Sequence, residues 1–259
     1  MAQKKIDRNR SRWTAKRGVL SMLEDIEDSD EFVCSVYITP KSLAARDYPT
    51  PVDWPHVSAL EAAVDATGSP DTGLAVFVAE TRSIAVVPPF PLTADLVCDG
   101  ADVTPMRHLL QSEPTVGVVL LRLGRYAVGV LRGDKLVASK TASRYMKNRH
   151  RAGGQSQRRF ERSRERLIRE LYDKACEVVG DVFSPYQRAM DHVMFGGERH
   201  TLDGLLLRCR RLRDVEGKTL GRLLPVDSPN QKALQGIARE VWMSRIIRFG
   251  DPHGESPER

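Results

Sequence analysis

Residues 116–138, Val-Gly-Val-Val-Leu-Leu-Arg-Leu-Gly-Arg-Tyr-Ala-Val-Gly-Val-Leu-Arg-Gly-Asp-Lys-Leu-Val-Ala, decide the fold of this chain. Three apolar runs are separated by two short turns, at Gly124-Arg125 and at Gly133-Asp134. Runs of this length, rich in valine and leucine and bounded by glycine, predict three antiparallel strands in a meander. The first run is apolar almost throughout, which is typical of a central strand that is buried on both faces.

The sequence after this meander predicts alternating helices and strands. A basic segment leads into a long helix whose apolar residues, among them Leu167, Leu171 and Val178, recur at helical spacing. A meander followed by helix, strand, helix, strand and helix predicts an α/β fold of the ribonuclease-H type. The later elements are expected over 192–195 (strand), 202–212 (helix), 223–226 (strand) and 231–246 (helix).

The residues before the meander predict a smaller α+β domain. Three apolar runs read as strands, and three segments with helical spacing read as helices, while the proline-bearing stretch 40–55 reads as a loop. The strands are expected over 32–38, 74–79 and 83–87, and the helices over 13–27, 57–66 and around 106–110. We therefore expect a disordered basic arm (1–12), an N-terminal domain (13–112), a second domain (113–249) and a disordered tail (250–259).

The positive charge of the chain is concentrated in two places. The formal net charge is +6, yet residues 144–169 alone carry +8 and residues 1–17 carry +6, so the remainder is acidic. Two basic segments in an otherwise acidic chain are typical of a nucleic-acid-binding surface. A solvated basic helix with a solubilising tail is the alternative interpretation.

The composition excludes several other classes of protein. The mean hydropathy is −0.37, and no run approaches the ~18 apolar residues of a membrane helix, so we expect a cytoplasmic protein that does not contact membranes. The four cysteines form no C-x-x-C pair and the six histidines show no ligand spacing, so no metal or other cofactor is expected. Cys34 and Cys98 lie in apolar runs and are interpreted as buried thiols of a reduced compartment.

The basic segment contains Gly153-Gly154-Gln155-Ser156. A pair of glycines lets the main chain adopt conformations that are closed to other residues and lets its N–H groups approach a ligand closely. The segment has no Asp, Glu or Cys between Arg144 and Phe160, and we expect His150 to contact RNA or be inert rather than act as a general base. Arginines suit a polyanionic partner, and they surround the glycines at Arg149, Arg151, Arg158, Arg159 and Arg162.

The stretch His150-x-x-Gly-Gly-Gln-Ser156, followed by Arg159-Phe160-x-Arg162, resembles the catalytic loop of the eukaryotic and archaeal class I peptide-chain release factors. In that family the loop also follows a strand meander and opens a long helix. The resemblance covers roughly residues 70–250. It implies a release-factor catalytic domain, and therefore a peptidyl-tRNA hydrolase whose partners are the large ribosomal subunit, its rRNA and peptidyl-tRNA.

The chain departs from the decoding factors in two ways. The interval between the expected strands 32–38 and 74–79 is too short for a stop-codon-reading hairpin, and no partner-GTPase domain is expected. The loop also has the pattern Arg149-x-Arg151-x-Gly-Gly-Gln, which resembles the Vms-like release factors, the codon-independent branch that acts on stalled large subunits. The resemblance implies a monomer that acts in ribosome-associated quality control.

The resemblance assigns the catalytic role to Gly153, Gly154 and Gln155. Gln155 would place the attacking water through its backbone N–H and its amide, while the glycines allow the close approach. Gln157 is a possible alternative amide. The arginines at 149, 151, 158, 159 and 162 would contact RNA phosphates.

Two other functions compete with this hypothesis. A ribonuclease-H-type nuclease needs clustered carboxylates that begin on the first strand, and Val116–Arg122 contains none. A non-catalytic ribosome- or RNA-binding protein with the same basic surface is the remaining alternative.

Overall fold

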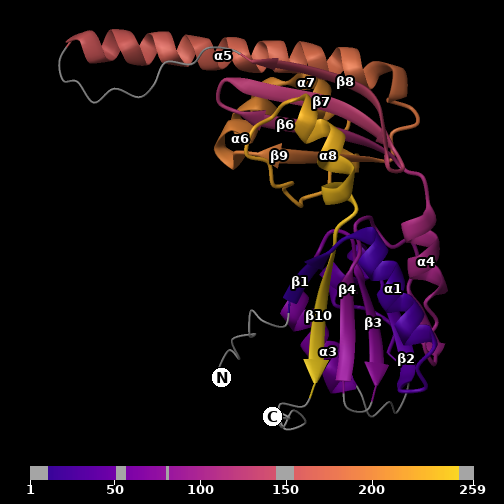
Figure 1. The fold of residues 1–259 in the computed structure, drawn as a ribbon. Coiled ribbons are helices and arrows are strands. Elements are labelled where there is room, and N and C mark those ends of the chain that lie inside the picture. The colour runs from indigo at the N-terminus through magenta and orange to yellow at the C-terminus, as the bar shows by residue number, and fades with distance from the viewer. Residues whose placement is uncertain (1–10, 51–56, 80–81, 144–154, 251–259) are drawn as a thin grey trace, which may run out of the picture. The chain divides into compact units, whose positions relative to one another are not determined.

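The chain forms two units in the computed structural model, which describes residues 11–50, 57–79, 82–143 and 155–250 (Figure 1). The first unit contains residues 1–112 and 242–259, and the second contains residues 113–241. For residues 57–59, 82, 155–158, 160 and 250 the backbone alone is described. The chain therefore leaves the first unit once and returns to it near its end.

The second unit is built on a four-stranded mixed sheet in the order β8-β7-β6-β9. The strands β6 (Thr115–Arg122), β7 (Arg125–Arg132) and β8 (Lys135–Ser143) form the predicted antiparallel meander, and β9 (His192–Gly197) lies parallel to β6. Residues 115–121 of β6 are all buried, because this strand has a neighbour on each side and is covered on both faces. The α/β fold of the ribonuclease-H type is confirmed.

Helices cover both faces of this sheet. Alternate residues of β7 (Tyr126, Val128 and Val130) pack into one apolar cluster with α5 (Gln155–Phe183), α6 (Arg199–Arg208) and α7 (Arg210–Arg213). On the other face, Leu234 of α8 (Gln231–Val241) approaches Gly129 of β7. The arginine-bearing elements α5, α6 and α7 therefore share one face of the sheet.

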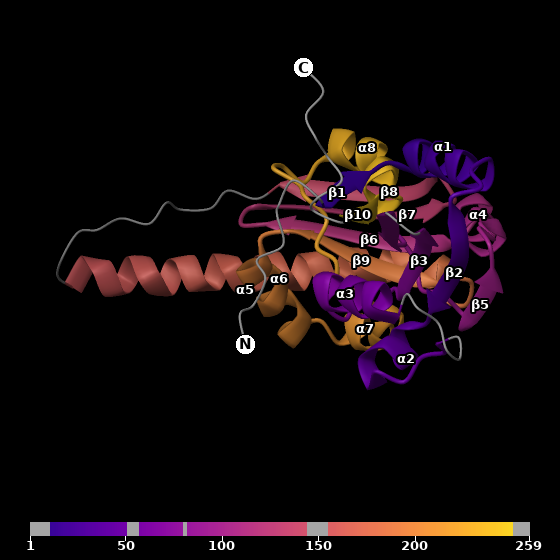
Figure 2. The ribbon, with the colours of Figure 1, turned by 90° about the horizontal axis from the view of Figure 1, so that it is seen from below.

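The helix α5 has 29 residues, and only its second half is anchored in the core. Leu171, Ala175, Val178 and Val179 are buried in the cluster beneath it, whereas none of the described side chains between residues 159 and 170 is buried. The first half accordingly runs past the edge of the sheet (Figure 2). Its outer end carries Gln155, so the candidate catalytic loop joins the helix at a distance from the core.

The first unit is a six-stranded sheet in the order β1-β10-β4-β3-β2-β5, and every pairing in it is antiparallel. The helices α1 and α4 contact each other, and α2 and α3 pack with the apolar cluster around Val36 and Val76. The strands are β1 (Ser11–Thr14), β2 (Phe32–Ile38), β3 (Leu74–Ala79), β4 (Arg82–Val87), β5 (Leu96–Asp99) and β10 (Ser244–Gly250), and the helices are α1 (Lys16–Glu27), α2 (Pro40–Ala45), α3 (Val57–Thr67) and α4 (Thr104–Gln111).

Several predictions of individual elements were wrong. The helix predicted over 231–246 ends at Val241, and β10 lies between β1 and β4, so residues 242–249 belong to the first unit and not to the second domain. Residues 11 and 12, predicted to be disordered, pair with β10. The stretch 40–55 contains α2, and 223–226 forms only an isolated bridge between Leu224 and Gly196. Residues 1–10 and 251–259 lie outside the described residues.

Candidate catalytic loop and nucleic-acid interface

The candidate loop connects β8 to α5. Gly153, Gly154, Arg149 and Arg151 lie outside the described residues, and so does His150. Gln155 is the first residue of α5, and Gln157 and Arg158 follow in its first turn, where the backbone alone is described. The roles assigned to these residues therefore remain predictions, while the position of Gln155 at a helix start is a structural observation.

This position has a chemical consequence for Gln155. The first four N–H groups of an α-helix have no partner within the helix, and the aligned peptide dipoles place about half a positive charge at that end. A backbone N–H at the start of α5 is thus suited to donate to a developing oxyanion or to a positioned water. In the sequence, two glycines, which have no Cβ, come immediately before it.

Four arginines follow along one stripe of the protruding half of α5. They recur at intervals of three and four residues, which places them on the same side of a helix. All four are exposed, and one of them, Arg166, forms an ion pair with Glu170 at 3.7 Å (Nε to Oε1). Of the four, only Arg159 and Arg162 were predicted from the sequence to contact RNA. This arginine stripe consists of Arg159, Arg162, Arg166 and Arg169.

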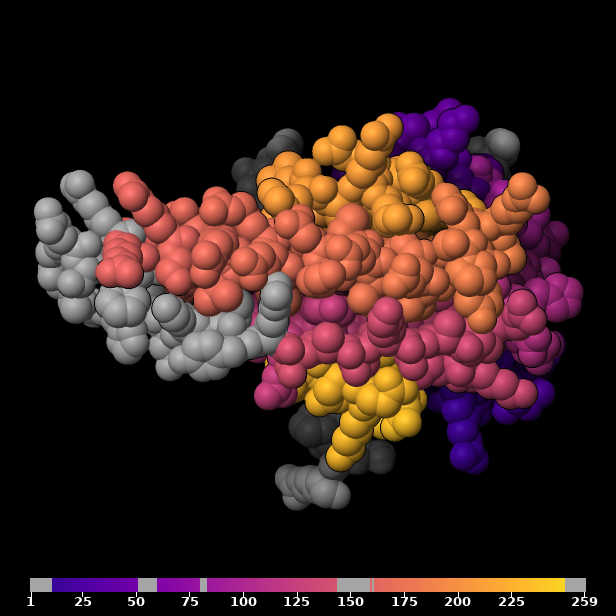
Figure 3. Space-filling model, turned by 90° about the horizontal axis from the view of Figure 1, so that it is seen from above, coloured from indigo at the N-terminus to yellow at the C-terminus, as the bar shows by residue number. Residues whose placement is uncertain are grey.

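A second group of arginines belongs to α6 and α7, which contact α5. These elements are the orange atoms beside α5 in Figure 3. This arginine segment is residues 208–213, Arg-Cys-Arg-Arg-Leu-Arg, at the junction of α6 and α7. Leu212 and the disulfide-bonded Cys209 are buried beneath it, whereas its four arginines are exposed. This group was not predicted from the sequence, because the net charge of the remainder of the chain is negative and conceals a local cluster.

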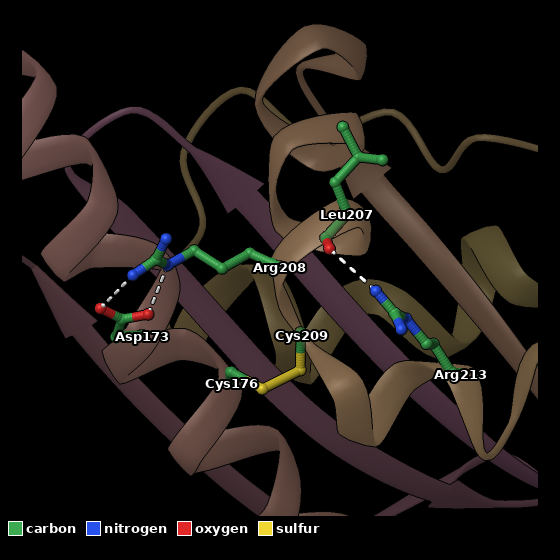
Figure 4. Close-up of a disulfide and its surroundings, with 6 residues drawn as sticks. All are labelled: Asp173, Cys176, Leu207, Arg208, Cys209 and Arg213. Atoms are coloured by element: carbon green, nitrogen blue, oxygen red, sulfur yellow. Dashed lines mark hydrogen bonds and ion pairs between the residues drawn. A yellow bond between two sulfur atoms is a disulfide. The ribbon is translucent and has the colours of Figure 1, made fainter.

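A disulfide and an ion pair link the arginine segment to α5 (Figure 4). Cys209 is bonded to Cys176 of α5, with 5.3 Å between their Cα atoms. Beside this bond, Arg208 donates to both carboxylate oxygens of Asp173, at 2.6 and 3.1 Å. The hydrogen bond from Arg208 holds the pKa of Asp173 below its ordinary value, and the charge of Arg169 lowers it further.

The disulfide was not predicted from the sequence. The two cysteines are separated by 33 positions, and no spacing rule connects a helix residue to a residue on a later element. The other two cysteines are free thiols, as interpreted from the sequence, although Cys98 is only partly buried. Burial raises the pKa of Cys34 to about 11, with Asp99 and Cys98 contributing, so this thiol is protonated at neutral pH.

Neither a metal centre nor a membrane span is found in the described part of the chain. No group of three or more His, Cys, Asp or Glu side chains among these residues could hold a metal ion. No described helix is both long and apolar enough to cross a bilayer.

Comparison with known proteins places this arrangement in a family. Residues 114–247 match the family model described as "Actinobacteria/chloroflexi VLRF1 release factor", which is slightly more than half of the chain. Among curated proteins, "Peptide chain release factor subunit 1" of Thermococcus sibiricus is 34% identical over 128 residues, which cover 45% of this chain and 31% of that protein. The same factor of Aeropyrum pernix is 27% identical over 210 residues, covering 73% of this chain and 54% of that protein.

The chain thus spans between about a third and a half of the length of these two relatives. Among solved structures, the archaeal termination factor aRF1 has a TM-score of 0.39 at 14% identity and covers 88% of this chain and 73% of its own. The structure titled "Vms1 mitochondrial localization core" has a TM-score of 0.39 at 11% identity and covers 82% of this chain and 90% of its own. The fold itself is defined by the strand order given above, and the family by the model match over residues 114–247. The chain belongs to the Actinobacteria/chloroflexi VLRF1 release factor family.

Proposed function

We propose that this chain hydrolyses the ester bond of peptidyl-tRNA and so frees nascent chains from stalled large ribosomal subunits, as part of translation quality control in the cytoplasm. The observation that carries the proposal is the sequence Gly153-Gly154-Gln155, which ends at the first residue of α5 within the region that matches a release factor family. The relatives named above as peptide chain release factors support the same reaction class.

The reaction needs a positioned water and a donor to the developing oxyanion. Positioning alone contributes several kcal/mol to lowering the barrier, and one fixed donor contributes a further ~2.7–4 kcal/mol. Gln155 has both groups that this requires, a backbone N–H at a helix start and a side-chain amide. The tRNA ribose and the rRNA would complete the site, which accounts for the lack of an acidic residue or cysteine in the loop.

The arginines have a different role in this proposal. Arg149, Arg151, Arg158, Arg159 and Arg162 would hold rRNA phosphates on either side of the loop, because a guanidinium binds a phosphate through two parallel hydrogen bonds. Their charge adds affinity but reads no sequence. Release is therefore expected without a codon in the ribosomal A site and without a partner GTPase.

The test is release of a labelled nascent chain from purified stalled large subunits in the absence of puromycin. Wild-type protein should free the peptide, on subunits without messenger RNA as well as on intact stalled ribosomes. Gln155→Ala and Gly154→Ala should abolish release, the first by removing the amide and the second by adding a Cβ where close approach is needed. Both should bind large subunits as the wild type does.

Gln157→Ala is the matched control, because it removes an equivalent amide two residues further along the same helix. Full release by Gln157→Ala would assign the reaction to Gln155, and the opposite pair of results would assign it to Gln157. Unchanged release by all three variants, or binding without any release by the wild type, would favour the alternative of a non-catalytic ribosome-binding protein. A requirement for a stop codon would contradict the codon-independent mechanism.

A further inference from the structure

The second half of α5 continues the arginine stripe with residues of another kind. The spacing of three and four residues runs on without interruption from Arg169 to Asp173, Cys176 and Gly180. These three positions carry no positive charge of their own. Each of them is instead the contact point of one residue from the arginine segment.

The three contacts lie in the same order along both elements. Arg208 forms its ion pair with Asp173, and Cys209 is bonded to Cys176. Gly180 lies against Arg211, since a Cβ added at Gly180 would be 2.5–2.6 Å from the Cδ, Nε and Cζ atoms of Arg211. A glycine within a helix costs roughly 0.5–1 kcal/mol relative to alanine, and here it makes room for an arginine side chain.

The arginines of the segment remain available to a partner. Across the described residues, no ion pair connects Arg210 or Arg211 to an acidic side chain, and Arg213 donates only to the carbonyl oxygen of Leu207, at 3.2 Å. The acidic side chain beneath them, Asp173, is already neutralised by Arg208. The disulfide holds the backbone at Cys209 against α5, so little backbone conformational entropy is left to lose there on binding.

We propose that the arginine stripe and the arginine segment form one continuous surface that binds an RNA sugar-phosphate backbone, starting at Arg159 and ending at α7. From Arg159 to Gly180 the helix rises about 30 Å, with a stripe position at every ~5 Å. A row of arginines at such intervals suits a linear chain of phosphates, each of which accepts two hydrogen bonds from a guanidinium. The proposal extends the RNA contacts of the proposed function, on which the identification of rRNA as the natural partner rests.

The test compares charge removal on α7 with the same charge removal on the opposite face of the sheet. Arg210→Gln/Arg211→Gln removes two arginines from the surface, and Lys232→Gln/Arg239→Gln removes two equally exposed charges from α8. Binding to a short RNA duplex and to purified large subunits is measured over a series of salt concentrations. All four substituted residues are exposed, so the variants are expected to fold, which far-ultraviolet circular dichroism checks.

The α7 variant should bind both probes about a hundredfold more weakly at low salt, with about tenfold from each of the two arginines that loses a hydrogen bond to a charged group. The slope of log K against log salt should fall by about 1.4–1.8, because each lost phosphate contact removes ~0.7–0.9. The α8 variant should keep the wild-type slope, and Arg210→Lys/Arg211→Lys should keep most of it. Equal slopes for the α7 and α8 variants would overturn the proposal.

Two further outcomes separate this inference from the proposed function. Weaker binding of the α7 variant to large subunits but not to the RNA duplex would show that the arginine segment contacts ribosomal protein. This result would also overturn the proposed RNA-binding surface. If the α7 variant binds both the RNA duplex and the large subunits as the wild type does, while release still depends on Gln155, the inference fails and the proposed function stands.

Discussion

Reduction of the Cys176–Cys209 disulfide should destabilise the second unit without affecting the first. The bond closes a loop that contains the end of α5, β9 and α6, and its cysteines are 33 positions apart. The chain-entropy relation gives about 3.5–4 kcal/mol of stabilisation for a loop of that length at 25 °C. With a urea dependence of about 2 kcal/mol per molar, a reduced second unit should unfold at a urea concentration lower by about 2 M.

The two units can be followed separately. The three tryptophans are Trp13, Trp54 and Trp242, and all belong to the first unit, so tryptophan fluorescence reports on that unit. Circular dichroism at 222 nm is dominated by helices, of which α5 is the longest described. A reducing agent should shift the unfolding transition seen by circular dichroism and leave the fluorescence transition in place.

Cys176→Ala/Cys209→Ala should reproduce the effect of the reducing agent and should no longer respond to it. Alanine is preferred to serine because Cys209 is fully buried and a hydroxyl there would need a hydrogen-bond partner. Cys98→Ser, which changes a free thiol, is the matched control and should respond to reduction like the wild type. Thiol titration of the unfolded protein should find two thiols before reduction and four after it. Four thiols before reduction would refute the reasoning.

Two further predictions concern the backbone at Gly197 and the charge of residues 1–10. Gly197→Ala should lower the free energy of unfolding by at least about 1–3 kcal/mol, the usual cost of a strained backbone conformation, because Gly197 has a φ of +115° and an added Cβ would lie 2.1 Å from the carbonyl oxygen of Leu121. Gly236→Ala on α8, where nothing lies within 4 Å of the added Cβ, should be neutral or slightly stabilising, and equal urea midpoints for the two variants would contradict this explanation. Deleting residues 1–10 removes Lys4, Lys5, Arg8 and Arg10 but spares β1, so ribosome binding should weaken and its salt slope should fall by up to about 3. An unchanged slope, measured by binding to large subunits at several salt concentrations, would show that these residues do not contact RNA.

The sequence was most informative where one local pattern has one structural solution. The runs 116–122 and 126–131 could be recognised as strands because their valines and leucines are bounded by glycine turns, and the pairing of β6 with β7 follows from the short turn between them. The resemblance also predicted that the loop opens a long helix, and Gln155 is the first residue of α5.

The errors occurred where a local pattern has more than one solution. No glycine or proline separates Val241 from Ile246 and Ile247, so the local sequence does not end the helix, and only the pairing of β10 with β4, over 150 residues away in sequence, decides that they form a strand. Ser11–Thr14 is too short and polar to be recognised without its partner β10. The disulfide and the packing of Arg211 against Gly180 likewise depend on contacts between distant segments. The full extent of the candidate RNA surface could therefore not be predicted from the sequence.

The place of β10 also has a consequence for how the protein is made. Chains fold from the N-terminus during synthesis, yet the sheet of the first unit needs β10, and the described part of β1 pairs with no other strand. All strands and helices of the second unit precede Trp242 in the sequence. The second unit can therefore complete its fold while the first still exposes the open edge of β4. The first unit, although it contains the N-terminus, completes its fold last.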